Sequence, residues 1–234
     1  MTDLVDPPRA RRHAFRTLNP EEAKRLIEGV RDDRLGALVA VAMMTGMREG
    51  ELLALRWRDV DLKRGTVQVR GSRQHDGTIR ETKTAGSRRL VLLPRVACEA
   101  LGRHRASQAS ERLRLGPEWE DNDLVFANKV GRTLSAQNLL QRYFYPTLER
   151  LELPRIRFHD LRHTAATLLL AEGVHPKIVS EMLGHTEVGI TLDLYSHVTP
   201  TMQAEAVRAL DAVFGSQNGS QDHDPERKIP GQPS

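Results

Sequence analysis

The sequence predicts an α+β fold, mainly α, with a small three-stranded antiparallel sheet. Most of the chain places apolar residues at helical spacing, whereas residues 66–93 alternate apolar and polar residues around the turn dipeptide Asp76-Gly77. Strands gathered in one segment, with helices before and after it, favour an α+β arrangement. The 234 residues are enough for one large domain or two small ones.

Three helices are expected in the first 55 residues. Asn19 has the character of a helix cap, and the helix that follows, Pro20 to about Val30, has proline at its first position and acids in its first turn. Leu35 to Met44 is apolar enough for a buried helix that stops at Gly46. Glu49 to Leu55 shows a third, shorter helical pattern.

The sheet is expected in the middle of the chain. Thr66 to Arg70 alternates like a strand, the Asp76-Gly77 turn follows, Thr78 to Thr82 returns, and Arg88 to Leu93 supplies a third strand.

The second half is expected to be helical, with one short apolar run at residues 124–127. Helices are predicted over residues 94–108, 135–151, 159–171, 176–183 and 200–214. Residues 215–234 are rich in glycine, proline and serine and have no periodic apolar face, which predicts a disordered tail. Residues 1–15 are expected to form a linker or N-terminal arm.

Composition predicts a cytoplasmic protein that does not cross a membrane. No apolar run approaches the ~18 residues of a membrane span, and residues 1–16 lack the apolar core of a secretory signal. Cys98 is the only cysteine and cannot form an internal disulfide, which fits a reducing compartment.

Basic residues are concentrated in one segment. Residues 56–89 contain ten basic and four acidic residues, a net charge of +6 in a chain whose formal net charge is +4. Such a segment suits a polyanion, because each neutralised phosphate releases condensed counterions. A solvated surface would also explain a charge run alone.

Arginine, histidine and tyrosine carry the chemistry of the recognisable motifs. The sequence has no glycine-rich phosphate loop, no paired-cysteine zinc pattern and no nucleophile-elbow serine. His159 and Arg162 are three residues apart, so they share one face of a predicted helix and can reach the same anion. Arg48 falls at a predicted helix junction, His185 follows a glycine helix stop, and Tyr195 comes ten positions later.

Four separated motifs make the sequence similar to the catalytic domain of the tyrosine recombinases, the phage-integrase family of site-specific recombinases. Between about residues 16 and 200, in the family's order, they are Thr-Gly-Met-Arg-Glu-Gly-Glu-Leu, Glu-Thr-Lys-Thr, His-Asp-Leu-Arg-His, and Leu-Gly-His with its downstream tyrosine. The resemblance implies a tyrosine-recombinase catalytic domain over residues 16–214. It places the family's catalytic residues on Arg48, Lys83, His159, Arg162, His185 and Tyr195.

The implied activity is site-specific DNA recombination, as integration or excision, through a 3′-phosphotyrosine intermediate. Arg48 and Arg162 would flank the scissile phosphate, because the guanidinium fork meets charge on non-bridging oxygens bidentately. His185 would donate a hydrogen bond to a phosphate oxygen. Glu51, one turn after Arg48, would orient the arginine or histidine side chains.

The nucleophile implied by the resemblance is Tyr195. Tyrosine has a pKa of ~10, so its deprotonation needs a nearby base, and His159 is the candidate. Lys83 on its hairpin would protonate the leaving 5′ oxygen, with Lys63 or Lys129 as the substitute if the hairpin register differs. No ATP, metal or other cofactor is implied.

Two histidines allow an alternative role as metal ligands, and two tyrosines allow an alternative nucleophile. His159 and His163 have the i, i+4 spacing of metal ligands, but Asp160 stands where the metalloprotease pattern has glutamate. Tyr143 and Tyr145 compete as nucleophiles by residue type, although they precede the His-x-x-Arg motif.

The length of the chain leaves three functions open for the whole protein. Family members commonly carry a helical DNA-clamping domain before the catalytic one, and only about fifteen residues precede the match here. The chain is therefore expected to be a minimal integrase, a truncated relic or a fragment of a longer protein. Recombination on behalf of a mobile element is the first hypothesis, and a non-cleaving DNA-binding relic of a truncated integrase is the second. A topoisomerase of the related tyrosine type is the third, because it shares the chemistry. The resemblance further implies a homotetramer on paired double-stranded DNA sites, with Ala204 to Phe214 docking on a neighbouring protomer.

Overall fold

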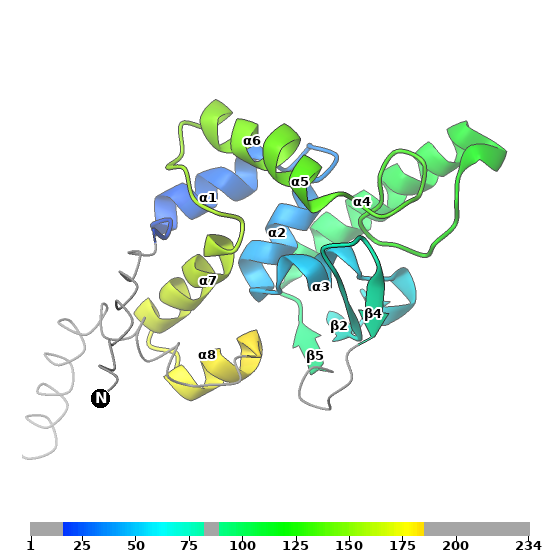
Figure 1. Ribbon diagram of the computed structural model, residues 1–234. Coiled ribbons are helices and arrows are strands. Elements are labelled where there is room, and N and C mark those ends of the chain that lie inside the picture. The colour runs from blue at the N-terminus through cyan, green and yellow to red at the C-terminus, as the bar shows by residue number, and fades with distance from the viewer. Residues whose placement is uncertain (1–15, 82–88, 185–234) are drawn as a thin grey trace, which may run out of the picture. The chain divides into compact units, whose positions relative to one another are not determined.

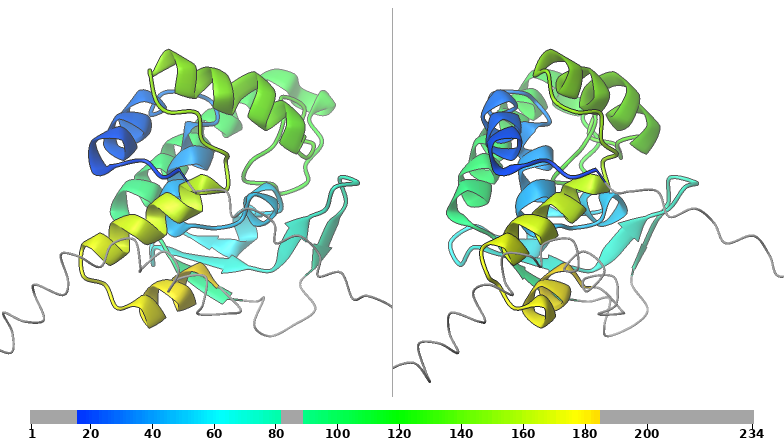
Figure 2. Two further views of the ribbon diagram at one scale, coloured as in Figure 1. Left: turned by 60° about the vertical axis from the view of Figure 1, so that its left-hand side comes forward. Right: turned by 90° about the vertical axis from the view of Figure 1, so that its left-hand side faces the viewer.

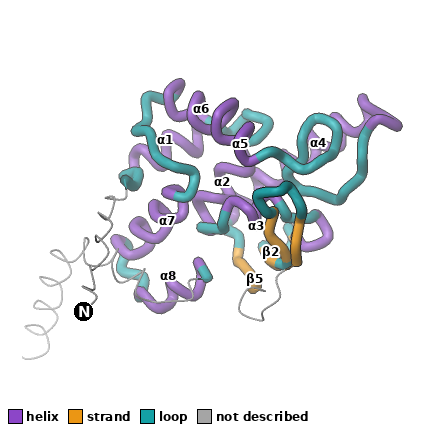
Figure 3. The backbone as a smooth tube through the Cα atoms, viewed as in Figure 1, coloured by secondary structure: helices purple, strands orange, loops and turns teal. Residues whose placement is uncertain are grey.

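The computed structural model describes residues 16–81 and 89–184. Lys83, His185, Tyr195, the expected helix at 200–214 and both terminal segments lie outside these described residues. Helices predominate and the strands are few and short (Figure 3), which confirms the predicted fold class. Within the described part of the chain, no helix is long and apolar enough to cross a membrane.

Helices come first along the chain, then the strands, then helices again. The elements are α1 (Pro20–Gly29), α2 (Gly36–Thr45), α3 (Glu49–Leu53), η1 (Trp57–Asp59), β1 (Val60–Asp61), β2 (Thr66–Val69), β3 (Gly71–Arg73), β4 (Ile79–Glu81), β5 (Arg89–Leu92), α4 (Arg95–Leu115), η3 (Gly116–Glu118), α5 (Ala136–Leu139), a π-helical turn η4 (Leu140–Phe144), α6 (Tyr145–Arg150), α7 (Asp160–Ala171) and α8 (Pro176–Leu183).

Helix α2 is the centre of the core. Its sequence is apolar on every side, and nine of its ten residues are buried. A helix that is hydrophobic all round must be covered all round, and α2 packs against α1, α3, α4 and α7 (Figure 1). Burial of a single leucine such as Leu38 contributes about 1.5–3 kcal/mol. The loop that leaves α2 is therefore anchored on a rigid element.

Helix α1 begins as the sequence predicts. The Asn19 side chain accepts a hydrogen bond from the Glu22 backbone N–H at 2.8 Å, and the Glu22 carboxylate accepts one from the Asn19 N–H at 2.9 Å. This capping box satisfies two backbone donors that would otherwise lack partners. The preceding Leu18 N–H donates to the Thr164 hydroxyl at 3.1 Å, which ties the start of α1 to α7.

The sheet differs from the prediction in its membership. The three-stranded antiparallel sheet has the order β1-β2-β5, with Val67 opposite both Val60 and Val91. Strand β4, which lies within the segment 78–82 expected in this sheet, instead pairs with β3 in a separate hairpin. That hairpin has no buried residue, so it has no apolar face to add to a core sheet. Strand β1 was missed because its two residues are too few to show alternation.

The helices of the second half follow the predicted order. Helix α4 continues to Leu115, past the expected end near residue 108, and stops at Gly116, which has a φ of +55°. Gln108 holds this extension, because its side chain accepts from the Trp57 indole N–H at 2.6 Å and donates to the Val125 carbonyl at 3.0 Å. Helices α7 and α8 pack together (Figure 2), and α8 ends where Gly184 adopts a φ of +70°.

Candidate active site

Arg48 stands in the bend between α2 and α3. Gly46 ends α2 with a φ of +60°, and a Cβ atom there would lie 2.1 Å from Leu183 Cδ2. Glycine is therefore required both by the left-handed backbone and by the close approach of α8. Arg48 follows as the N-cap of α3, and its side chain is 44% exposed. An anion from solvent can reach this guanidinium.

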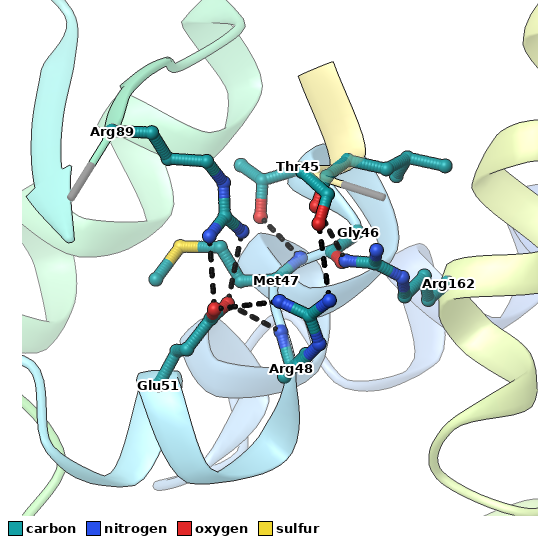
Figure 4. A network of polar contacts seen from close by, with 9 residues as sticks. Thr45, Gly46, Met47, Arg48, Glu51, Arg89 and Arg162 are labelled. Carbon is teal, nitrogen blue, oxygen red and sulfur yellow. Dashed lines mark hydrogen bonds and ion pairs between the residues drawn. The ribbon is translucent and has the colours of Figure 1, made fainter. Parts of the chain in front are cut away.

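Glu51 is buried beneath Arg48 and is surrounded by donors. Its carboxylate accepts from the Arg48 backbone N–H at 2.9 Å and from Arg48 Nη1 at 3.1 Å, and from Arg89 Nη1 and Nη2 at 2.8 and 2.9 Å (Figure 4). Burial alone would raise the pKa of Glu51, but the hydrogen bonds and charges of Arg89 and Arg48 outweigh it and lower that pKa. The carboxylate is held ionised.

Arg162 projects from the first turn of α7 and is 2% exposed. Its Nη1 donates to the carbonyl oxygens of Gly46 at 2.6 Å and Leu183 at 2.7 Å, while Arg48 Nη2 donates to the Gly184 carbonyl at 3.0 Å (Figure 4). Burial, and then the positive charge of Arg48, lower the pKa of Arg162 to about 9, so it remains protonated at neutral pH. The two arginines converge on the end of α8.

His159 and His163 form an edge-to-face pair at the start of α7, with ring centroids 4.9 Å apart. His159 lies at the surface as the N-cap of the helix, and His163 is buried. Partial desolvation and then the positive charge of Arg162 lower the pKa of His159. Burial and then His159 lower the pKa of His163 to about 4. Both imidazoles are therefore kept neutral near pH 7, which is the form that accepts a proton.

The structure brings together Arg48, Glu51 and Arg162, and places His159 on the same helix as Arg162. Lys83, His185 and Tyr195 lie outside the described residues, although β5 begins six residues after Lys83 and Gly184 directly precedes His185.

The two lysines expected as substitutes for Lys83 are exposed and lie outside the helices and strands. Lys63 is in the turn between β1 and β2, where its backbone N–H donates to Asp61 Oδ1 at 3.0 Å, and Lys129 is exposed in the loop after residue 127.

The competing tyrosines have structural roles. The Tyr143 hydroxyl donates to Asp33 Oδ2 at 3.3 Å, and burial followed by the negative charge of Asp33 raises the pKa of Tyr143. A raised pKa makes the phenolate harder to form, which disfavours Tyr143 as a nucleophile. Tyr145 packs against Phe144 and lies beneath the Arg155 guanidinium, 4.3 Å from its ring centroid. Among the described residues no group of three metal-ligating side chains occurs.

Arg89 belongs to this cluster and was not predicted. On β5 the residues at 89 and 91 face inward, while Leu90 and Leu92 are 61% and 68% exposed. An arginine at an inward position of an alternating strand needs a buried partner. The sequence alone carries no signal for this inward position, because Leu90, Val91 and Leu92 are all apolar; the structure shows that Glu51 is the partner.

Comparisons with known proteins give the family of the chain. Residues 16–202 match the family model described as the phage integrase family. A "Tyrosine recombinase XerC-like" protein of Caldanaerobacter subterraneus subsp. tengcongensis is 36% identical over 213 residues, which cover 85% of this chain and 54% of that protein. An "Integrase" of Streptomyces ambofaciens is 32% identical over 82% of this chain and 52% of that protein. The chain spans about half the length of these two curated relatives.

Solved structures support the same fold. The crystal structure of XerA recombinase superposes with a TM-score of 0.64 at 29% identity, covering 92% of this chain and 68% of that one. The Tn1549 transposon integrase, in a complex with circular intermediate DNA, has a TM-score of 0.69 at 21% identity over 84% of this chain and 68% of that one. The tyrosine-recombinase-like fold predicted from the sequence is confirmed, and the chain belongs to the phage integrase family.

Proposed function

We propose that this chain performs site-specific DNA recombination, cleaving and rejoining strands through a 3′-phosphotyrosine intermediate, with residues 16–214 as the catalytic domain. The observation that carries the proposal is the convergence of Arg48 and Arg162 beside a buried, ionised Glu51. The guanidiniums of Arg48, Arg89 and Arg162 are gathered around one carboxylate, that of Glu51, so the described cluster has an excess of positive charge that favours an anion. A phosphodiester at the exposed Arg48 is such an anion.

The arginines stabilise the charge that develops on the non-bridging oxygens. Arg162 is buried and held by two backbone carbonyls, so its position is fixed before substrate binds. Arg48 is partly exposed and is held by Glu51 from below. Donors preorganised in this way lower the barrier without reorganising during the reaction. His185, next to the Gly184 carbonyl that Arg48 binds, supplies a further donor to a phosphate oxygen.

Three groups move protons and form the covalent bond. The Tyr195 hydroxyl oxygen attacks phosphorus, its proton passes to His159, and the bond from phosphorus to the 5′ oxygen breaks. Lys83 protonates that leaving oxygen. The lowered pKa of His159 keeps its imidazole neutral and able to act as the base. Attack by a 5′ hydroxyl of another strand reverses the step, so the reaction needs no external energy source.

The proposed partner is double-stranded DNA, bound by a homotetramer on paired sites. One relative by structure, XerH, has been solved bound to its difH substrate, at 26% identity and a TM-score of 0.58. The basic segment 56–89 supplies positive charge for phosphates. The helix expected at Ala204 to Phe214 is the proposed docking element between protomers, and the cytoplasm is the proposed location.

Trapping of the covalent intermediate tests this function. Nicked duplexes with a randomised core are incubated with the protein in EDTA, and protein-linked DNA is recovered and sequenced to define a site. A defined suicide substrate then gives a covalent band with the wild-type chain and none with Tyr195→Phe. A binding band without covalent product would instead indicate a non-cleaving DNA-binding protein, and would overturn the proposal.

A further inference from the structure

We propose that Arg89 is a positioning residue, which fixes the direction of the Arg48 guanidinium through Glu51 and braces the turn that precedes His185. The inference rests on the proposed function, because it concerns how Arg48 meets the scissile phosphate. Arg89 itself is not placed in contact with DNA.

The bond between Arg89 and Glu51 is a buried fork. Both terminal nitrogens of Arg89 donate to the two carboxylate oxygens, at 2.8 and 2.9 Å, and the side chains are 11% and 6% exposed. The pair joins β5 to α3, which are 38 positions apart in the sequence. A bidentate guanidinium fixes the plane of the carboxylate. Glu51 can therefore receive Arg48 from only one side.

Glu51 divides its acceptor capacity between the two arginines. Two of the four hydrogen bonds that it accepts come from Arg89, and two come from the backbone and Nη1 of Arg48. If the fork is lost, the plane of the Glu51 carboxylate is no longer fixed, and its oxygens have acceptor capacity that Arg89 no longer fills. The Arg48 guanidinium is then drawn toward Glu51 and away from the exposed position where an anion can reach it.

Arg89 also supports the end of α8. A Cβ atom on Gly184 would lie 2.9 Å from Arg89 Nε and 3.1 Å from its Cζ. The guanidinium cannot move away from Gly184 without breaking its two hydrogen bonds to Glu51. The Gly184 carbonyl in turn accepts from Arg48 at 3.0 Å. Arg89, Glu51, Arg48 and Gly184 thus form a closed circuit of contacts, and His185 is the next residue.

The pair Arg34–Glu111 provides a matched control. Arg34 Nε and Nη2 donate to the two Glu111 oxygens at 2.7 and 2.8 Å, so this is also a fork between distant segments. Its side chains are 26% and 17% exposed. Replacing arginine by lysine keeps the charge in both pairs and removes the bidentate geometry. An effect specific to Arg89→Lys therefore reports position and not the general loss of a fork.

The test compares two substrates at the defined site, one with a normal scissile phosphate and one with a methylphosphonate, which has no charge for Arg48 to balance. Arg89→Lys is expected to form covalent complex about 10- to 100-fold more slowly on the phosphate, with DNA affinity within about threefold. The defect should shrink on the methylphosphonate, as it should for Arg48→Ala, and Arg89→Lys should add little in an Arg48→Ala background.

An equal defect on both substrates, an unchanged rate, or the same defect in Arg34→Lys would overturn the inference. If Arg89→Lys does not fold by thermal denaturation, Arg89→Gln is measured in the same way, because it also removes the bidentate fork and leaves Gly184 unchanged. Failure of the wild-type chain to form any covalent complex would count against the proposed function instead, so the two failures are distinguishable.

Discussion

Two arginine–carboxylate forks of nearly the same geometry lie in different parts of this protein. Arg34 binds Glu111 at 2.7 and 2.8 Å and directs its third nitrogen, Nη1, to the Ala127 carbonyl at 3.0 Å. Arg89 binds Glu51 at 2.8 and 2.9 Å, but Glu51 also binds a second cation, Arg48, which is open to solvent. The Arg34–Glu111 fork is completed by a hydrogen bond to a backbone carbonyl, so we expect it to stabilise the fold. The second ends in a guanidinium that an anion can reach.

The strength of an ion pair therefore does not identify a functional cluster. Both carboxylates have pKa values lowered by their arginines. What separates them is where the remaining donors point: Arg34 directs all three nitrogens to the protein, whereas the Glu51 cluster contains the side chain of Arg48, 44% exposed. Removal of each arginine should consequently show in a different measurement.

The largest expected effect is on catalysis at the Glu51 cluster. Arg48→Ala should slow formation of the covalent complex by about 100- to 1,000-fold, because a preorganised donor to the developing charge is lost. Its effect on unfolding should be small, since Arg48 is partly exposed and Glu51 keeps Arg89. Rates are measured on the suicide substrate and stability by urea denaturation. A large loss of stability with a normal rate would contradict a catalytic role for the Glu51 cluster.

The next largest effect is on stability at the other fork. Arg34→Ala leaves the Glu111 carboxylate and the Ala127 carbonyl without their donor, which should lower the free energy of unfolding by about 1–3 kcal/mol. The rate of covalent complex formation by the folded fraction should remain close to wild type. Urea denaturation measures the loss of stability, and single-turnover cleavage measures the rate. A cleavage defect comparable to that of Arg48→Ala would instead give this fork a role in catalysis.

The same contrast between a buried group and a reactive one separates His163 from His159. His163 has a folded-state pKa of about 4 against an ordinary value near 6.5. Its contribution to stability is therefore complete above pH 6.5 and is lost as the pH falls toward 4. Between pH 7 and 5 the free energy of unfolding should fall by roughly 1–2 kcal/mol. In His163→Asn the slope should be flatter, and an identical slope would assign the loss to other groups.

The smallest effect concerns the pH dependence of cleavage. Desolvation and then the charge of Arg162 lower the pKa of His159. Its neutral, proton-accepting form therefore persists to a pH below the ordinary pKa of histidine. The rate of covalent complex formation should therefore fall only below about pH 6.5. The profile is measured on the suicide substrate, with His159→Gln as the control. If that variant keeps the same midpoint, another group titrates.

Local signals predicted most of the fold correctly. The capping pattern at Asn19 and the all-round apolar sequence of α2 indicated the first two helices, because caps and burial are decided by neighbouring residues. The sheet was less predictable. Pairing of β1 with β2 depends on a two-residue strand and a turn held by the Asp61 carboxylate, which accepts from the backbone N–H groups of Lys63 and Arg64. Such a short strand leaves no periodic trace.

The candidate site shows the same division. The order of the motifs indicated Arg48 and Arg162, helical spacing indicated Glu51, and the structure brings these three together. Arg89 escaped notice because its role depends on a contact with α3 across 38 positions, and no local pattern encodes that contact. The roles of Lys83, His185 and Tyr195 stay predictions from the motifs, because these residues lie outside the described part of the chain.

Identification of the residue that becomes joined to DNA shows whether Tyr195 is the nucleophile. The covalent complex is digested with nuclease and protease, and the peptide that remains joined to a nucleotide through phosphate is located by mass spectrometry. We expect the modification on Tyr195, in the peptide that contains Leu194 and Ser196. A modification on Tyr143 or Tyr145, or on a residue other than tyrosine, would contradict the proposed mechanism.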